Sequence, residues 1–131
     1  MVCPYCSHES SVTNSRLQKR ANSVWRRRKC LNCGAIWTSV ERLEASTVWR
    51  VQHNGHLLSF SYETLYISLY EALKHKKTAV TEAKHLCDTV MQKLASKHTA
   101  ILSTELIVQT TYNILRRYDK LAAALYKTTH S

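Results

Sequence analysis

Strand-like alternation of polar and apolar residues dominates the first third of the chain. The alternating stretches are rich in Ser, Thr, Val and Trp and lack apolar residues at 3.6-residue spacing; they cover residues 10–16, 23–29 and 35–42. We expect them to form a three-stranded antiparallel ribbon. Because strand side chains alternate between faces, Arg26 and Arg28 should lie on one side and Arg27 and Lys29 on the other.

A second pair of strands is predicted further along. Residues 47–52 alternate, and residues 57–60 form a possible return strand. Between them lies Asn54-Gly55, a pair favoured in tight hairpin turns because both residues accept positive φ angles. These residues predict a short β-hairpin.

From Ser61 the apolar period lengthens to that of a helix. Ser61 is a suitable N-cap, and four apolar residues after it share one helical stripe: Leu65, Leu69, Ala72 and Leu73. Similar patterns predict helices at about 81–97, from 103 or 104 to a bend near 118–119, and at 120–127. The chain therefore predicts an α+β protein, with a ribbon at 1–44 and a hairpin packed on a small helical bundle at 45–131.

Cysteine spacing gives the N-terminal segment its chemistry. Cys3 and Cys6, and then Cys30 and Cys33, form two pairs with two residues between the members of each. This spacing lets four thiolates close a tetrahedral structural zinc site, so we expect one Zn2+ per chain. Two disulfides or a thioredoxin-like redox motif are the alternatives, and both fit the spacing less well. Cys87 has no partner cysteine nearby and is expected to be a buried apolar residue.

Positive charge is concentrated around the predicted zinc site. The 131 residues carry a formal charge of +10, and residues 1–44 contribute eight Lys or Arg against three Asp or Glu. Four of these cations are consecutive, at 26–29, and Arg16 is close to them in sequence. A basic strand on a rigid ribbon favours contact with nucleic acid phosphates, whereas the alternative is a solvated edge that prevents strand pairing.

Several classes of protein are disfavoured. No uncharged stretch approaches the ~18 apolar residues of a membrane span, and the first residues do not resemble a signal peptide, so we expect a cytoplasmic protein without membrane contact. Gly-rich phosphate loops, Ser/His/Asp arrangements and carboxylate pairs do not stand out, and four thiolates leave zinc no open position for water. We therefore do not expect an enzyme.

The cysteine knuckles and their flanking residues resemble a known family. The segments Cys3-Pro4-Tyr5-Cys6, Asn14-Ser15-Arg16, Trp25 to Gly34 and Trp37 to Arg42 are similar to the zinc ribbon of NrdR, the bacterial repressor of ribonucleotide reductase genes. The resemblance implies a zinc-dependent repressor whose ribbon binds promoter boxes in double-stranded DNA. It points to five DNA-contacting residues: Arg16, Arg26, Arg27, Arg28 and Lys29.

The resemblance also implies an ATP-cone in the second domain, which binds ATP or dATP and sets the homo-oligomeric state. Aligned on Gly55, the chain departs from the family pattern, with Leu58 in place of a Glu and Thr64 in place of a helix Lys. The remaining candidates for nucleotide contact are Arg50, Gln52, His53, His56 and Phe60. Two other functions stay open: a zinc-ribbon module that binds an acidic protein, and a nucleotide sensor that acts without DNA.

Overall fold

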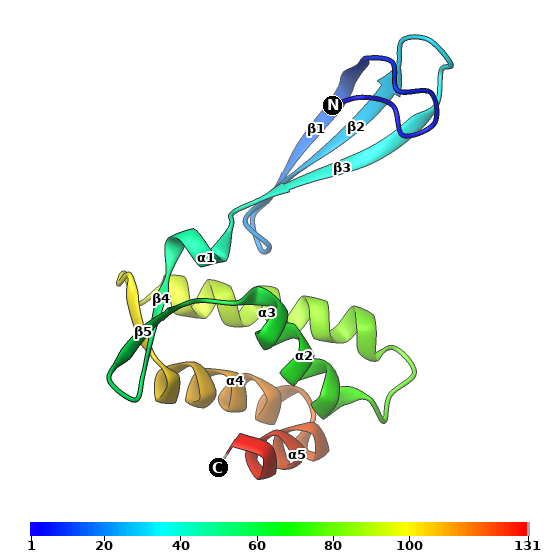
Figure 1. Cartoon of the computed structure of the whole chain (residues 1–131). Helices are drawn as coiled ribbons and strands as arrows, with labels where there is room; N and C mark the ends of the chain where they lie inside the picture. Colours follow the sequence, from blue (N-terminus) through cyan, green and yellow to red (C-terminus); the bar gives the residue numbers. More distant parts are fainter. Residues whose placement is uncertain (131) are drawn as a thin grey trace. The chain divides into compact units, whose positions relative to one another are not determined.

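The N-terminal part of the chain is a three-stranded antiparallel sheet. The computed structural model describes residues 1–130, which divide into two compact units, the first spanning Met1–Leu43 and the second beginning at Glu44. In the first unit the strands β1 (Ser10–Gln18), β2 (Ser23–Cys30) and β3 (Ile36–Arg42) pair in the order β1-β2-β3 (Figure 1). The predicted ribbon is confirmed.

The second unit combines a small sheet with helices. Its elements are α1 (Ala45–Val48), β4 (Arg50–His53), β5 (His56–Ser59), α2 (Tyr62–Leu73), α3 (Ala79–Ala95), β6 (Ile101–Ser103), α4 (Thr104–Tyr118) and α5 (Lys120–His130) (Figure 1). Together with the ribbon, they confirm the predicted α+β class. No helix within residues 1–130 has the length and apolar character that crossing a bilayer requires.

The hairpin forms where the sequence predicts it. Strands β4 and β5 pair antiparallel, and Asn54 and Gly55 between them have φ angles of 49° and 78°. Both angles lie in the left-handed region, as a tight two-residue hairpin turn requires. The hairpin is part of a larger sheet, however, because β6 pairs parallel with β4. A three-residue strand gives too short a pattern to be recognised in the sequence.

The predicted strand at 47–52 is wrong in its first half. Residues 47 and 48 belong to the short helix α1, and β4 begins only at Arg50. The turn is held by the Thr47 hydroxyl, which donates to the Glu44 carbonyl at 2.6 Å, and by the Trp49 N–H, which donates to the Ala45 carbonyl at 3.1 Å. This turn buries Trp49 edge-on against Phe60, with ring centroids 5.4 Å apart. Tertiary burial therefore outweighs the strand preference of Thr-Val-Trp.

Helix boundaries follow local capping. The Ser61 hydroxyl accepts a hydrogen bond from the Thr64 N–H, and the Ser103 hydroxyl accepts one from the Leu106 N–H, both at 3.1 Å. These contacts confirm the predicted starts of α2 and α4. The helices enclose a core of fully buried side chains that includes Leu69, Leu73, Val90, Leu94, Leu102 and Leu115.

Asp119 separates the last two helices. Its carboxylate accepts a hydrogen bond from the Ala122 N–H at 3.0 Å, and it lies 3.5 Å from His75 and 3.6 Å from Lys76. The Ala122 N–H, with further help from His75 and Lys76, lowers the pKa of Asp119 below its usual value of 3.8. A lowered pKa contributes stability above pH 3.8 that is lost as the pH falls further.

We predict that Asp119→Ala lowers the free energy of unfolding of the helical unit by about 1 kcal/mol at pH 7, since it removes the cap of α5. Urea titrations followed by the helical circular dichroism signal measure this loss. Asp119→Asn is the matched variant, because it keeps a capping oxygen and removes only the charge. The difference between wild type and Asp119→Ala should shrink at pH 3, and an equal difference at both pH values would contradict the role of the charge.

Candidate metal centre and basic face of the ribbon

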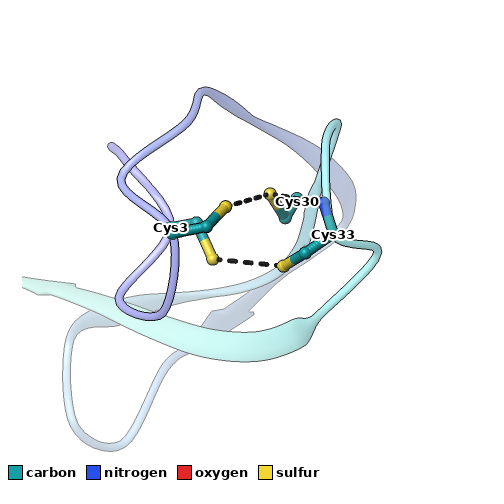
Figure 2. Close-up of side chains that lie close together, drawn as sticks. Cys3, Cys30 and Cys33 are labelled. Atoms are coloured by element: carbon teal, nitrogen blue, oxygen red, sulfur yellow. Dashed lines mark hydrogen bonds between the residues drawn. The ribbon is translucent and has the colours of Figure 1, made fainter.

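Four cysteines converge at one end of the ribbon. Cys3 and Cys6 lie in the N-terminal loop, Cys30 ends β2, and Cys33 lies in the turn that leads to β3. Their four sulfurs are all within 4.8 Å of one another. Figure 2 shows Cys3, Cys30 and Cys33 directed toward this common space.

The sulfur separations suit a tetrahedral metal ion. Cys3 Sγ lies 3.7 Å from Cys33 Sγ, and Cys6 Sγ lies 3.4 Å from Cys30 Sγ. Zn–S bonds of about 2.3 Å place tetrahedral sulfurs about 3.8 Å apart, whereas a disulfide needs about 2.05 Å. All four cysteines are free thiols. The donor set therefore fits zinc and does not form the two disulfides considered as an alternative.

Each knuckle turns sharply so that both of its sulfurs point inward. Ser7 and Gly34, which follow the second cysteine of each pair, have φ angles of 64° and 74°. Backbone N–H groups then point at the sulfurs: that of Tyr5 donates to Cys3 Sγ at 3.4 Å, and that of Asn32 donates to Cys30 Sγ at 3.3 Å. Such donors stabilise thiolates, the form that binds metal.

The pKa values of Cys6 and Cys33 are shifted in opposite directions. The backbone N–H of His8 is the main cause that lowers the pKa of Cys6 to about 5. For Cys33, the Ala35 N–H lowers the pKa, but burial and the neighbouring cysteines outweigh it and raise the pKa to about 11. Adjacent thiolates repel one another, so a divalent ion must supply the compensating charge, and its binding releases protons.

The five predicted DNA-contacting residues divide between the two faces of the sheet. Arg16 pairs across the strands with Trp25, and Arg16, Arg27 and Lys29 are exposed on one face. Arg42 lies on this face as well, opposite Ser23. The paired positions of β1, β2 and β3 on this face carry four cations and no carboxylate. We call this surface, defined by Arg16, Arg27, Lys29 and Arg42, the basic face.

Arg26 and Arg28 lie on the opposite face and are half-buried. The Arg28 Nε donates to the Ser39 hydroxyl at 2.8 Å, which fixes the guanidinium against β3. One terminal nitrogen of Arg26, Nη1, is buried without a hydrogen-bond partner within residues 1–130. Glu41 is also on this face, opposite Val24. Its carboxylate partly offsets the positive charge that Arg26 and Arg28 give to this face.

The candidate nucleotide-binding residues are brought together only in part. His53 and Phe60 line a cavity of about 340 Å³ beneath the hairpin, whereas Arg50, Gln52 and His56 are exposed and do not line it. Phe60 reaches the cavity while packed against Trp49. His53 Nδ1 lies 3.0 Å from the Thr104 hydroxyl, which joins the hairpin to the start of α4.

Most of the residues that line this cavity were not predicted. Its wall includes Thr104, Ile107 and Val108 from α4 and Tyr126 and His130 from α5. These residues lie far beyond the hairpin in the sequence and have no motif of their own, so only the tertiary fold reveals them.

We predict that Cys30→Ser reduces zinc content well below one ion per chain and unfolds the ribbon, because zinc contributes about 10 kcal/mol or more to ordering a site of this kind. Elemental analysis and the dispersion of ribbon amide resonances measure both effects. Cys87→Ser is the matched control, since Cys87 is a buried thiol of α3 outside the cluster, and this variant should keep full zinc content. Full zinc loading of Cys30→Ser would contradict the assignment.

Comparison with known proteins agrees with this geometry. Residues 1–41 match the family model described as the transcriptional repressor NrdR-like N-terminal domain, a zinc ribbon. Over 123 residues, 93% of the chain, it is 31% identical to the transcriptional repressor NrdR of Chlamydia felis and covers 80% of that protein. It is 29% identical over 133 residues to the NrdR of Herminiimonas arsenicoxydans, with 98% of the chain and 85% of the relative aligned, and 27% identical over 132 residues to that of Fervidobacterium nodosum, with 97% and 86% aligned. The chain therefore belongs to the NrdR family of transcriptional repressors.

Proposed function

We propose that this protein is a zinc-dependent transcriptional repressor, without enzymatic activity, that binds double-stranded DNA through the basic face of its ribbon. The observation that carries the proposal is the alignment of Arg16, Arg27 and Lys29 on one exposed face of a sheet that four cysteines fix at its end. Phosphates along a duplex attract such a surface, and guanidinium groups can also make paired contacts with guanine edges.

The two faces of the sheet support different roles for the arginines. On the basic face, the Arg27 side chain is exposed and free to approach a phosphate. On the other face, Arg28 is held by Ser39, and both Arg28 and Arg26 are half-buried. We propose that Arg16, Arg27 and Lys29 make the main contacts, and that Arg26 and Arg28 act from the opposite face, where they also stiffen the sheet.

Self-association through the second unit is the other part of the proposal. A single ribbon reaches only a few base pairs, so linking several ribbons raises the effective affinity for spaced operator sites. The second unit exposes apolar side chains that a partner copy can cover, including Val48, Leu57, Leu58, Ile67, Val80 and Leu121. Sedimentation of the zinc-loaded protein measures this association.

The cavity beneath the hairpin fits part of a nucleotide. Its hydroxyls, two imidazoles and Phe60 suit an uncharged nucleoside, but neither Lys nor Arg lines it. A triphosphate needs cations or aligned N–H donors, so the residues present do not fit that portion of ATP or dATP. We propose that the unit has kept its assembly role and that any response to ATP or dATP rests on weak recognition of the nucleoside.

We predict that Arg27→Ala makes the slope of log K against log salt concentration less steep by about 0.9, because one phosphate contact is lost. Fluorescence anisotropy with a reductase-promoter duplex at several salt concentrations measures the slope. Arg28→Ala is the internal comparison: it should change the slope less and lower the thermal midpoint of the ribbon. An unchanged slope for Arg27→Ala would show that Arg27 does not contact a phosphate. Absence of duplex binding at low salt would instead favour the zinc-ribbon module that binds an acidic protein.

We predict that adenosine and ATP perturb the cavity to a similar extent at equal concentration, since the triphosphate gains no cation there. Amide chemical shifts of Thr64, Ser68 and Ile107, which line the cavity, provide a readout specific to this site. His53→Ala should weaken both ligands equally. Saturation of these shifts by ATP at a concentration ten times lower than adenosine requires would show that the cavity does recognise the triphosphate.

A further inference from the structure

A concave, positively charged groove lies between α4 and α5, apart from the cavity beneath the hairpin. Its volume is about 660 Å³, within the range of about 300–1,000 Å³ typical of small-molecule sites. Tyr112 and Arg116 line it from α4, and Lys120 and Lys127 line it from α5. The groove shares no lining residue with the cavity beneath the hairpin.

Helical spacing brings the three cations to the same place. Tyr112 and Arg116 are four residues apart on α4, and Lys120 and Lys127 are seven apart on α5, so each pair shares one helix face. The Lys127 ammonium lies 5.5 Å and the Arg116 guanidinium 6.0 Å from the centre of the Tyr112 ring. Both cations therefore approach the same aromatic side chain from different helices, and the small residues Ala123 and Ala124 also line the groove.

Among residues 1–130, no carboxylate compensates the charge of the groove. No carboxylate lines it, and within residues 1–130 the structure has no ion pair for Arg116, Lys120 or Lys127. Asp119 is adjacent to Lys120 in sequence, but its carboxylate caps α5 and lies beside His75 and Lys76. Two other lysines of the same unit do have ion pairs: Lys74 with Glu71 at 2.8 Å and Lys76 with Glu82 at 2.9 Å. Three unpaired cations around one concavity repel one another, and a bound anion removes that repulsion.

We propose that this groove binds the polyphosphate group of a small anion. Arg offers paired donors that match phosphate oxygens, and Lys adds point charges that can follow a chain of phosphates. The three cations line one groove, which suits a compact ligand, whereas a duplex presents phosphates in a long row and needs cations spread over a longer surface. The inference concerns a different unit from the proposed DNA contacts, so either can fail without the other.

Calorimetry with inorganic pyrophosphate tests the proposal on the full-length, zinc-loaded protein. Pyrophosphate carries no nucleoside, so its binding does not report on the cavity beneath the hairpin. We expect one pyrophosphate per chain, an affinity that falls as salt rises, and at least tenfold weaker binding by Lys127→Gln and by Arg116→Gln. Lys84→Gln is the matched control, because it removes one exposed lysine of α3 outside the groove and should leave the affinity unchanged.

Two further measurements separate the outcomes. Arg27→Ala should retain pyrophosphate binding, which distinguishes the groove from the basic face of the ribbon, and unchanged thermal midpoints of the groove variants would exclude misfolding as the cause of their loss. Absence of pyrophosphate binding, or an equal reduction in Lys84→Gln, would overturn the proposal. If Lys127→Gln weakens duplex binding while pyrophosphate does not bind, the groove serves nucleic acid and the small-anion assignment is wrong.

Discussion

The four-cysteine cluster takes the place of a hydrophobic core in the N-terminal unit. Within Met1–Leu43 the buried residues are Cys3, Ser23 and Cys30, and none is a large apolar side chain. Apolar residues such as Leu17, Ile36 and Val40 are at least half exposed instead. A segment of this size buries too little surface to fold by the hydrophobic effect alone, so metal coordination must supply the stabilising free energy.

A ribbon without a core has two surfaces available to solvent, and this explains how it tolerates consecutive arginines. Burying unpaired guanidinium groups would cost several kcal/mol each. Here alternation places Arg27 and Lys29 in solvent on one face and leaves Arg26 and Arg28 only half-buried on the other. The same run of charges would be incompatible with a strand packed against a helix layer. The source of stability and the capacity to present charge are therefore linked.

Local signals in the sequence account for much of the fold, and long-range contacts account for what was missed. Cysteine spacing, the Asn54-Gly55 turn and the Ser61 and Ser103 caps each act within a few residues, so they could be read directly. Strand β6 and the far wall of the hairpin cavity could not, because each depends on contact between segments about fifty or more residues apart. The strand predicted at 47–49 failed because a local turn buries Trp49 against Phe60, and this burial outweighs the strand preference of the segment.

The second unit is stabilised differently, and this separates its chemistry from that of the ribbon. Leucines from α2, α3, α4 and β6 form its core, so burial of apolar side chains contributes to its stability. Its cationic side chains can then either pair with carboxylates of the chain or bind a ligand. Lys76 forms an ion pair with Asp119, whereas at the α4–α5 groove no carboxylate among residues 1–130 lies beside the three cations. Like charges that share one groove repel one another, so an anion from outside the chain would stabilise this surface more than it would stabilise a single exposed lysine.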